Sequence, residues 1–442
     1  MENIQKKAAE LASFFLNNLS KFDKIYIVSH KDTDGIAACA LLYITLSRYK
    51  KVETRIVSQI YTETLNKLKK IVGDNLVVFS DLGSSFCEEI EEKFKYYIIL
   101  DHHPVKNCKA NILNPHLFGY NGAYDLSGSG AAYLFCKNLY PEIKKYSYLA
   151  ILGAIGDKQN DPFQGLNLEI IKEGKGIFER YGKNIFIKNV EDDLKDGEYF
   201  SSLLNACGTL DKENLGLQVC IQNKEAIKEA KKIYEKYDRE LDRALKHFLE
   251  NKDKIIEENR KRSAYFICTK TKRNLTGPLS TLLIKIFNDK PVIVISKKDN
   301  LKISARGTKE LVSQGLHLGE ALKIAVNGKG EGGGHDIASG AIYHGDAEEF
   351  IERLDFEIKK QLKKGFLIEG ELMFDYENEK IASSVAEAID VDNEKPLKAT
   401  LIETYSNRNI FITKVKSESI GTFKNVIDDV LVCVKSAEIM KE

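Results

Sequence analysis

The chain has 442 residues, which is too long for one ordinary domain and predicts two or three. A hydrophobic content of 43%, a charged content of 30% and a net charge of +1 describe a globular protein and exclude a disordered or strongly basic one. No apolar stretch reaches the roughly 18 residues of a membrane helix, and no signal-peptide core opens the chain. We therefore expect a cytoplasmic protein with no membrane partner, whose eight cysteines are buried thiols.

Residues 24 to about 165 alternate short apolar strands with helical stretches. This alternation predicts a parallel sheet with crossover helices, and strands that are apolar throughout predict helices on both faces. We assign residues 1–223 to this first α/β domain. The expected strands are Lys24–Ser29, Val52–Ser58, Leu76–Ser80 and Tyr96–Leu100, and the helices include Ile36–Tyr49 and Thr62–Lys70.

Acidic and imidazole side chains follow apolar segments of this domain at four places. Because ligands of open α/β sheets bind at the carboxyl ends of the strands, we expect these groups to gather at one edge. Their nitrogen and oxygen atoms suit Mn²⁺ or Mg²⁺. The groups are His30, Asp32 and Asp34; Asp81; Asp101-His102-His103; and Asp157, which closes the apolar run Tyr148–Ile155.

Each of these groups, taken alone, has an ordinary explanation. Aspartates after strands are commonly helix N-caps, Asp32-Thr33-Asp34-Gly35 can be a turn or part of a calcium loop, and adjacent histidines are often incidental. All four groups in order within one domain favour a functional site. Asp32 and Asp34 can each reach one of two cations and Asp81 can bridge them. Two cations about 3.5–4 Å apart stabilise the attacking and leaving oxygens of phosphoryl transfer.

Residues 224–262 repeat apolar side chains at spacings of three and four, without Pro or Gly. The pattern predicts a long amphipathic helix, about 55 Å long if continuous. Two interpretations stay open. The helix is either the seam of a coiled-coil dimer or a bridge between two domains, because a second α/β pattern begins beyond it.

Residues 263–365 form the second predicted α/β domain. A glycine run, Gly328–Gly334, lies between its last two strands and ends at His335. It is either a linker or a loop whose backbone amides approach a phosphate closely, and the guanidinium of Arg306 also suits phosphate oxygens. The expected strands are Ala264–Thr269, Pro291–Ser296, Leu301–Ala305 and Ser339–Tyr343.

These motifs together resemble those of the DHH phosphoesterase superfamily. His30-x-Asp32-x-Asp34-Gly35, Asp81, Asp101-His102-His103 and Asp157 are similar to its four motifs. Leu204-Asn205-Ala206-Cys207-Gly208 resembles a segment of its RecJ branch, and Ile303–Arg306 with Gly332–His335 resembles the DHH-associated domain. The resemblance covers about residues 20–365 and is nearest to archaeal RecJ-like exonucleases. It implies a parallel-sheet DHH domain, a long bridging helix and a second α/β DHH-associated domain.

The resemblance also implies a role for each residue. Two divalent ions, Mn²⁺ in preference to Mg²⁺, would be held by Asp32, Asp34, Asp81, His102 and Asp157, with His30 as a further ligand. His103 would contact the scissile phosphate or assist the leaving group, and Asp101 would orient it. The end of the substrate strand would be held by Asn205, Arg306, Gly332, Gly333, Gly334 and His335. Thr209 stands where RecJ relatives carry an arginine.

The implied function is exonuclease hydrolysis of single-stranded DNA or RNA, through activation of water by two metals. It would release nucleoside 5′-monophosphates in DNA repair, replication or RNA turnover. Two alternatives stay open: a phosphodiesterase of short oligoribonucleotides or cyclic dinucleotides, and a non-catalytic scaffold of the replication machinery. We expect such a scaffold to have lost metal ligands, yet all five core positions are present here.

Residues 366–442 predict a small α+β domain. Its segment Ser417–Leu431 resembles the last helix region of the small, dimer-forming subunit of the KEOPS tRNA-modification complex. That resemblance implies a homodimer or a docking site for a replication or repair protein; the alternative is an appended unit that completes the fold. The expected elements are strand Glu369–Asp375, helix Lys380–Ile389, strands Lys398–Tyr405 and Asn409–Val415, and helix Gly421–Met440.

Overall fold

The computed structural model describes residues 3–105, 108, 111–269, 275–297, 300–362, 368–392, 400–417 and 420–439. The chain forms two compact units, Met1–Arg243 and Ala244–Glu442, and each is described by itself. Lys398 and Met440, which we expected to begin a strand and end a helix, lie outside the described residues, as does the expected domain boundary at 365 and 366.

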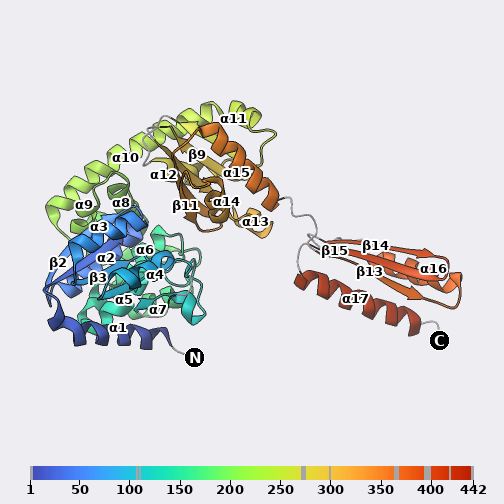
Figure 1. The fold of residues 1–442 in the computed structure, drawn as a ribbon, viewed down its shortest axis with the longest axis horizontal. Coiled ribbons are helices and arrows are strands. Elements are labelled where there is room, and N and C mark those ends of the chain that lie inside the picture. The colour runs from blue at the N-terminus through green and yellow to red at the C-terminus, as the bar shows by residue number, and fades with distance from the viewer. Residues whose placement is uncertain are drawn as a thin grey trace. The chain divides into compact units, whose positions relative to one another are not determined.

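The first unit is built on a parallel sheet with the strand order β2-β1-β3-β4-β5 (Figure 1). This confirms the predicted parallel α/β fold. The strands are β1 (Lys24–His30), β2 (Lys51–Val57), β3 (Leu76–Ser80), β4 (Tyr97–Leu100) and β5 (Ile112–Leu113). The helices are α1 (Ile4–Asn18), α2 (Thr33–Leu46), α3 (Thr62–Val72), α4 (Cys87–Lys93), α5 (Gly128–Leu139), α6 (Ser147–Gly156), α7 (Gly165–Glu173), α8 (Gly197–Thr209) and α9 (Glu213–Cys220).

Both faces of this sheet are covered, because successive side chains of a strand point to opposite faces. Ile25 and Ile27 of β1 pack with the core side chains of α1, α2, α5 and α6. Tyr26 and Val28 pack with those of α3 and α4 on the other face. The sheet is therefore the middle of three layers, which accounts for its continuously apolar strands.

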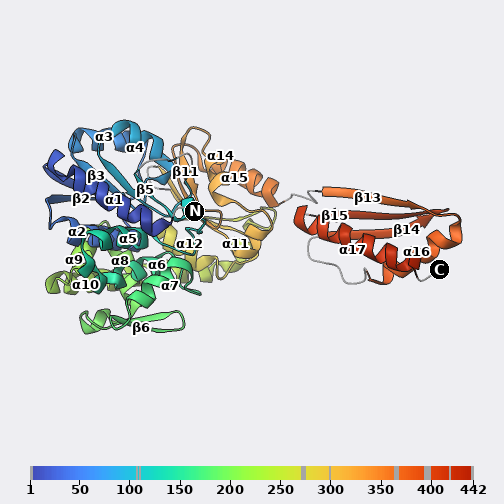
Figure 2. The ribbon, with the colours of Figure 1, turned by 90° about the horizontal axis from the view of Figure 1, so that it is seen from below.

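A short hairpin, β6 (Phe178–Tyr181) and β7 (Asn184–Ile187), follows α7. Figure 2 shows it at the border of the first unit, where β6 is labelled. Gly182 occupies the turn with a φ of +62°, a conformation that favours glycine in two-residue hairpin loops. The sequence did not predict this element.

Two cysteines differ from the expectation of eight thiols. Cys87 and Cys108 are paired as a disulfide, with Cα atoms 5.7 Å apart. They are 21 residues apart in sequence, so the spacing of cysteines along the chain gave no sign of the pairing. Of the other six, Cys39, Cys136, Cys207 and Cys220 are buried, as expected, whereas Cys268 is exposed and Cys433 is half-buried.

The long helix predicted over residues 224–262 is wrong as a single element. It consists of α10 (Lys224–Glu250) and α11 (Lys252–Glu258). Asn251 separates them, and its side-chain amide donates to the His247 carbonyl at 2.8 Å. The boundary between the two units falls inside α10.

The second unit contains a five-stranded mixed sheet with the order β11-β12-β10-β9-β8. Only β8 and β9 pair in parallel among these strands, and the other pairs are antiparallel. The strands are β8 (Tyr265–Thr269), β9 (Val292–Ser296), β10 (Leu301–Arg306), β11 (Gly330–Gly334) and β12 (Ala338–Tyr343). The helices are α12 (Thr276–Leu283), α13 (Lys309–Ser313), α14 (Leu318–Ala325) and α15 (Ala347–Leu362).

The glycine run is a strand and not the expected loop or linker. Gly330–Gly334 forms the edge strand β11, which pairs with β12. A side chain on Gly330 would place its Cβ 2.1 Å from the Ile342 carbonyl oxygen, and one on Gly332 would lie 3.0 Å from that of Leu322 in α14. Most of the glycines therefore serve close packing, a requirement that composition alone cannot separate from flexibility.

The C-terminal residues form the predicted small α+β domain. Its antiparallel sheet has the order β13-β15-β14, and Figure 2 shows α16 and α17 on the same side of it. The elements are β13 (Ile368–Asp375), α16 (Glu379–Asp392), β14 (Thr400–Asn407), β15 (Ile410–Ser417) and α17 (Ile420–Ile439). Among the residues that the structure describes, no helix is both long enough and apolar enough to span a membrane.

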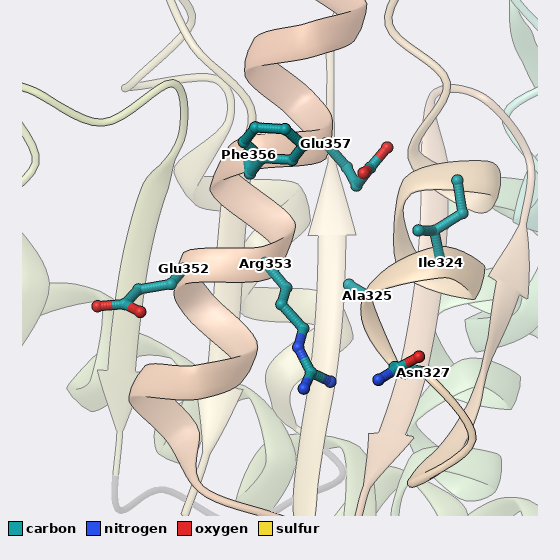
Figure 3. Close-up of a pocket in the computed structure, with 7 residues that line it drawn as sticks. All are labelled: Ile324, Ala325, Asn327, Glu352, Arg353, Phe356 and Glu357. Carbon is teal, nitrogen blue, oxygen red and sulfur yellow. The ribbon is translucent and has the colours of Figure 1, made fainter.

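A groove of about 420 Å³ lies between α14 and α15. Figure 3 shows Arg353 and Glu357 directed from α15 toward the α14 side. The lining residues include none of the predicted site residues; they are Ile324, Ala325, Asn327, Glu352, Arg353, Phe356 and Glu357. The groove therefore has no part in the predicted site.

The glycine strand gives a test of the fold. We expect Gly330→Ala to lower the free energy of unfolding by about 1–3 kcal/mol, because the new methyl group collides with a backbone carbonyl. Gly333→Ala is the matched control, since nothing lies within 4 Å of a Cβ at that position. Urea unfolding of the two variants measures the difference, and equal stabilities would contradict the packing role of Gly330.

Candidate metal centre

The order of strands brings the predicted ligands together. β1, β3 and β4 are parallel neighbours, so their carboxyl ends lie side by side. His30 is the last residue of β1, Asp81 directly follows β3, and Asp101 directly follows β4. Asp157 reaches the same edge from the end of α6.

The start of α2 supplies two further carboxylates. Asp32 is the N-cap, and its Oδ1 accepts from the Gly35 backbone N–H at 3.0 Å. Asp34 is fully buried in the first turn. Its oxygens accept from the backbone N–H groups of Gly128 and Ser129, at 2.6 and 2.9 Å. These two amides belong to the first turn of α5, where the helix dipole favours a negative charge.

The potential ligands form three groups, all of which include Asp81. One adds Asp101, His102 and His103, and the two that concern the predicted ligands are described in turn. The first of these contains His30, Asp32 and Asp81. His30 Nδ1 lies 2.8 Å from Asp32 Oδ2 and 3.4 Å from Asp81 Oδ2. One ligand atom from each residue lies within 4.8 Å of the others. This group can hold one cation.

The second group contains Asp34, Asp81, His102 and Asp157. His102 Nε2 lies 3.1 Å from Asp157 Oδ2, 3.2 Å from Asp81 Oδ1 and 3.8 Å from Asp34 Oδ2. Asp81 faces the first group with Oδ2 and the second with Oδ1. A cation in each group would therefore have Asp81 as a common ligand.

The surroundings of Asp81 indicate whether the site suits metal ions. It is 2% exposed, and its oxygens lie 3.4 Å from His30 Nδ1 and 3.2 Å from His102 Nε2 without the geometry of a hydrogen bond to any group in the described part of the chain. A buried carboxylate in this state is costly unless it is paired or coordinates a metal. Oxygen atoms of carboxylates with imidazole nitrogens fit Mn²⁺ or Mg²⁺. The residues present therefore fit the implied ions.

The backbone fixes the orientation of His102. The Gly122 carbonyl accepts a hydrogen bond from His102 Nδ1 at 2.7 Å, which leaves Nε2 directed at the carboxylates. The same carbonyl accepts from the Gln159 amide at 2.9 Å. A carbonyl partner on the far nitrogen is the usual arrangement for a histidine that binds metal.

Asp101 makes its contacts with His103 and the backbone. Its Oδ1 lies 2.8 Å from His103 Nδ1, and its Oδ2 accepts from the Ser84 backbone N–H at 2.9 Å. The Asn114 amide donates to the His103 carbonyl at 2.9 Å. Asp101 is buried, whereas the His103 side chain is 34% exposed. The geometry suits the predicted division of roles, in which Asp101 orients His103 toward substrate.

Burial and mutual charge shift the pKa values of this cluster. Burial raises the pKa of Asp34 and of Asp81, and neighbouring carboxylates raise both further. Burial opposes protonation of His30 and His102, but the adjacent carboxylates outweigh it and hold both pKa values well above 6.5. The metal-free cluster therefore retains protons that cations would displace.

His116 lies beside the site, and the sequence did not predict it there. Its Nε2 would lie 2.8 Å from a Cβ on Gly122, and the His102 carbonyl oxygen would lie 1.9 Å from that Cβ. Burial and the positive charge of His102 lower the His116 pKa. The only sequence signal was the run Asn114-Pro115-His116 after a short apolar segment.

The segment around Asn205 supports the loop that carries Asp32. Gly208 of α8 packs against this loop, since a Cβ there would lie 1.6 Å from the Lys31 carbonyl oxygen. Asn205 itself is hydrogen-bonded to the hydroxyl of Tyr237 in α10. The contact with substrate stays a prediction for Asn205.

The predicted phosphate-binding residues of the second unit lie at one end of its sheet. Arg306 pairs with Ala338 of β12, and Gly334 of β11 pairs with the next residue, Ser339. Burial lowers the pKa of Arg306 to about 10, so it stays cationic at neutral pH. Its guanidinium donates to the Thr281 hydroxyl at 3.1 Å and to a backbone carbonyl at 2.8 Å. Neither partner neutralises its charge.

Gly332, Gly333 and His335 lie on or directly after the edge strand β11. Gly332, Gly333 and Gly334 are predicted to bind substrate through their backbone. Of these glycines, only Gly333 has open space where the Cβ of a larger residue would lie. Gly332 and Gly334 are packed against α14 and β12. The open position is where a ligand can approach the backbone.

Comparison with known proteins agrees with this geometry. Residues 24–155 match the DHH family, N-terminal domain, and residues 264–364 match the DHHA1 domain. The chain is 28% identical over 447 residues to the uncharacterized protein MJ0831 of Methanocaldococcus jannaschii, a match that covers 82% of this chain and 99% of that protein.

The fold is also similar to solved RecJ structures. RecJ from Thermus thermophilus in complex with Mn²⁺ is 18% identical, with a TM-score of 0.60, over 80% of this chain and 54% of that one. The chain thus spans about half the length of that RecJ. A structure of exonuclease RecJ bound to manganese matches with the same identity and TM-score, over 80% of this chain and 95% of that one.

The two matched segments identify a DHH domain and a DHHA1 domain in this chain. In this order they give the protein the RecJ-like architecture that its motifs predicted. The predicted resemblance of the C-terminal domain to the KEOPS subunit stays a prediction.

Because this cluster holds protons, we expect the stability of the metal-free protein and its stabilisation by metal to change in opposite directions with pH. The folded pKa values of His30 and His102 lie above 6.5, so their stabilising protonation is fully present below about pH 6.5 and is lost as the pH rises through the folded values. We therefore expect the metal-free protein to lose stability above that pH. Stabilisation by Mn²⁺ should grow with pH, because the metal binds the deprotonated groups.

Thermal unfolding in EDTA or in Mn²⁺, from about pH 6 to pH 9, measures both trends. The double variant His30→Gln with His102→Gln should flatten both, while His344→Gln, outside the cluster, should change neither. A metal-free melting temperature that is as constant with pH as that of the double variant would contradict the prediction.

Proposed function

We propose that this protein is a metal-dependent exonuclease that hydrolyses phosphodiester bonds at the end of single-stranded DNA or RNA and releases nucleoside 5′-monophosphates. The observation that carries the proposal is Asp81, whose two carboxylate oxygens face two separate ligand groups. Two divalent ions, Mn²⁺ in preference to Mg²⁺, suit these groups. When bound, such ions supply charge stabilisation for the attacking and leaving oxygens of a phosphodiester.

The chain's own residues supply the remaining chemistry. Burial opposes protonation of His103, but the charge of Asp101 outweighs it and raises the His103 pKa. Asp101 engages Nδ1 and fixes the ring, and the role we propose for His103 is to contact a phosphate oxygen or to give a proton to the leaving oxygen. Asp101 thereby acts as a positioning residue.

The second unit supports a substrate that is a polymer. Arg306 offers a half-buried cation that bonds to an uncharged hydroxyl and a backbone carbonyl, and Gly333 leaves a strand edge open to a phosphate. Contacts of this kind hold the nucleic-acid backbone and carry no sequence information. We infer an enzyme without base preference, with a role in DNA repair, replication or RNA turnover.

Asp81→Asn tests the proposal. We expect release of mononucleotides from end-labelled 20-mers of DNA and RNA in Mn²⁺ to fall more than about 100-fold, beyond the loss typical of an outer-shell residue. The physical reason is that one carbonyl oxygen replaces a charge shared by two cation sites. Asp289→Asn, a carboxylate of the second unit, is the control and should retain full activity.

The outcomes separate the alternatives. A wild-type protein that cleaves only short oligoribonucleotides or cyclic dinucleotides would replace the exonuclease with the smaller phosphodiesterase. A wild-type protein that cleaves no phosphodiester in Mn²⁺ or Mg²⁺ would leave the scaffold as the function. Full activity of Asp81→Asn would refute the shared site.

We also propose that the C-terminal domain forms a homodimer, with docking of a repair or replication protein as the alternative. The sheet face opposite α16 and α17 carries an apolar row in which Ile412 pairs with Met373 and with Tyr405. Met373 is 62% exposed and Tyr405 is 39% exposed. Light scattering of the full chain should give a dimer for wild type and a monomer for Met373→Glu, while Phe356→Glu stays dimeric. A monomeric wild type would refute the homodimer.

A further inference from the structure

The hairpin β6–β7 lies outside the matched DHH segment, which ends at residue 155, and it exposes two aromatic rings. Its inner face anchors it, since Phe178, Ile185 and Ile187 are buried in the core of the first unit. The alternation of the strands directs Tyr181 and Phe186 outward, where they are 61% and 41% exposed. Their ring centroids are 5.8 Å apart. Adjacent exposed aromatic rings on an anchored hairpin are unusual unless they bind something.

The charges around the rings are mainly positive. Residues 175–188 contain four basic side chains and one acidic one. Lys188 pairs with Glu179 at 2.7 Å, and Lys183 lies 3.9 Å from Asp161. Arg180 donates through Nε to the Gly182 carbonyl, which leaves its terminal nitrogens for other partners.

The acidic segment that packs beside β7 contains one lysine of its own, and part of its charge is paired with that lysine and with α10. Asp192 pairs with Lys195 at 2.6 Å, and Asp193 pairs with Lys231. Asp196 caps α8 through the Tyr199 backbone N–H. The hairpin itself therefore carries more basic than acidic side chains beside two exposed aromatic rings, although Glu179 accepts from the Tyr181 hydroxyl at 2.8 Å. Rings with basic side chains suit nucleic-acid bases and phosphates.

The hairpin is tied to the metal centre. The Asn160 amide donates to the Lys183 carbonyl in the hairpin turn at 3.5 Å. Asn160 is three residues after the ligand Asp157, so chain geometry puts the turn no more than about 20 Å from Asp157. At the ~3.4 Å rise of a stacked strand, that distance corresponds to about six nucleotides.

We propose that the β6–β7 hairpin is a stacking platform for a single-stranded substrate, at which bases a few nucleotides from the cleaved bond contact Phe186 and Tyr181. Stacking on rings accepts any base, in keeping with an enzyme that does not read sequence. The inference rests on the proposed function for the identity of the strand, and its binding test does not depend on catalysis.

Binding is measured first, in EDTA so that no strand is cleaved, with 20-mers that carry 2-aminopurine at successive positions. The chain contains no tryptophan, so the fluorescence of the probe is read without interference. We expect quenching at positions near the bound end and a loss of affinity of about tenfold in the double variant Phe186→Ala with Tyr181→Ala. The single variant Phe186→Tyr, which keeps a ring at this position, should bind nearly as tightly as wild type. Phe356→Ala, which removes an exposed ring of the second unit, should leave the affinity unchanged.

Hydrolysis in Mn²⁺ then tests the position of the platform. The double variant should lose about tenfold in kcat/KM on 20-mers, in line with the lost stacking, and keep the wild-type rate on dinucleotides, which are too short to reach it. Equal losses on both lengths would show a structural role and overturn the proposal. So would unchanged affinity for strands, which would leave the hairpin as a protein-binding surface. A wild type that binds strands through the hairpin but hydrolyses none refutes the proposed function alone.

Discussion

The structure depends on keeping like charges together in a small buried space. Asp34 and Asp81 are almost fully buried within 4.8 Å of Asp157, and their raised pKa values show the cost of ionising them side by side. Imidazoles supply part of the missing positive charge and the N-terminus of α5 supplies more. What is still lacking is charge of the density that divalent cations provide, so the fold holds a site that is unfavourable by itself and that such cations would complete.

The rest of the first unit is arranged to maintain that crowding. The parallel order β1-β3-β4 aligns three strand ends, and the layers on both faces prevent them from moving apart. Glycines allow the approach: a Cβ on Gly128 would lie 2.7 Å from the Asp81 side chain, and one on Gly153 would lie 1.9 Å from Asp34. We expect such positions to be as intolerant of substitution as the ligands themselves, although they contribute no ligand atom.

The sequence predicted the elements that follow from local patterns. The strands, their parallel direction in the first sheet and the acidic strand ends came from periodicity and motif spacing, and the structure has these strands in parallel. The sequence could not predict contacts between distant segments. The amides of Gly128 and Ser129 that hold Asp34, the Cys87–Cys108 pair and the position of His116 depend on tertiary packing. The break at Asn251 was missed although it is local, because the apolar period continues on both sides of it.

Thr209 is the position at which this chain departs from the RecJ pattern. The arginine that RecJ relatives carry after this glycine is absent, but α8 still ends against the loop that carries Asp32, because Gly208 lies against the Lys31 carbonyl. Lys31 lies in that loop, and its ammonium group pairs with Asp211 at 2.8 Å, just beyond the helix. The segment therefore keeps its packing role and a nearby cation, although Asp211 offsets that charge. For the proposed nuclease, a grip on the substrate phosphates would then come from elsewhere, which gives weight to the hairpin β6–β7 and to Arg306.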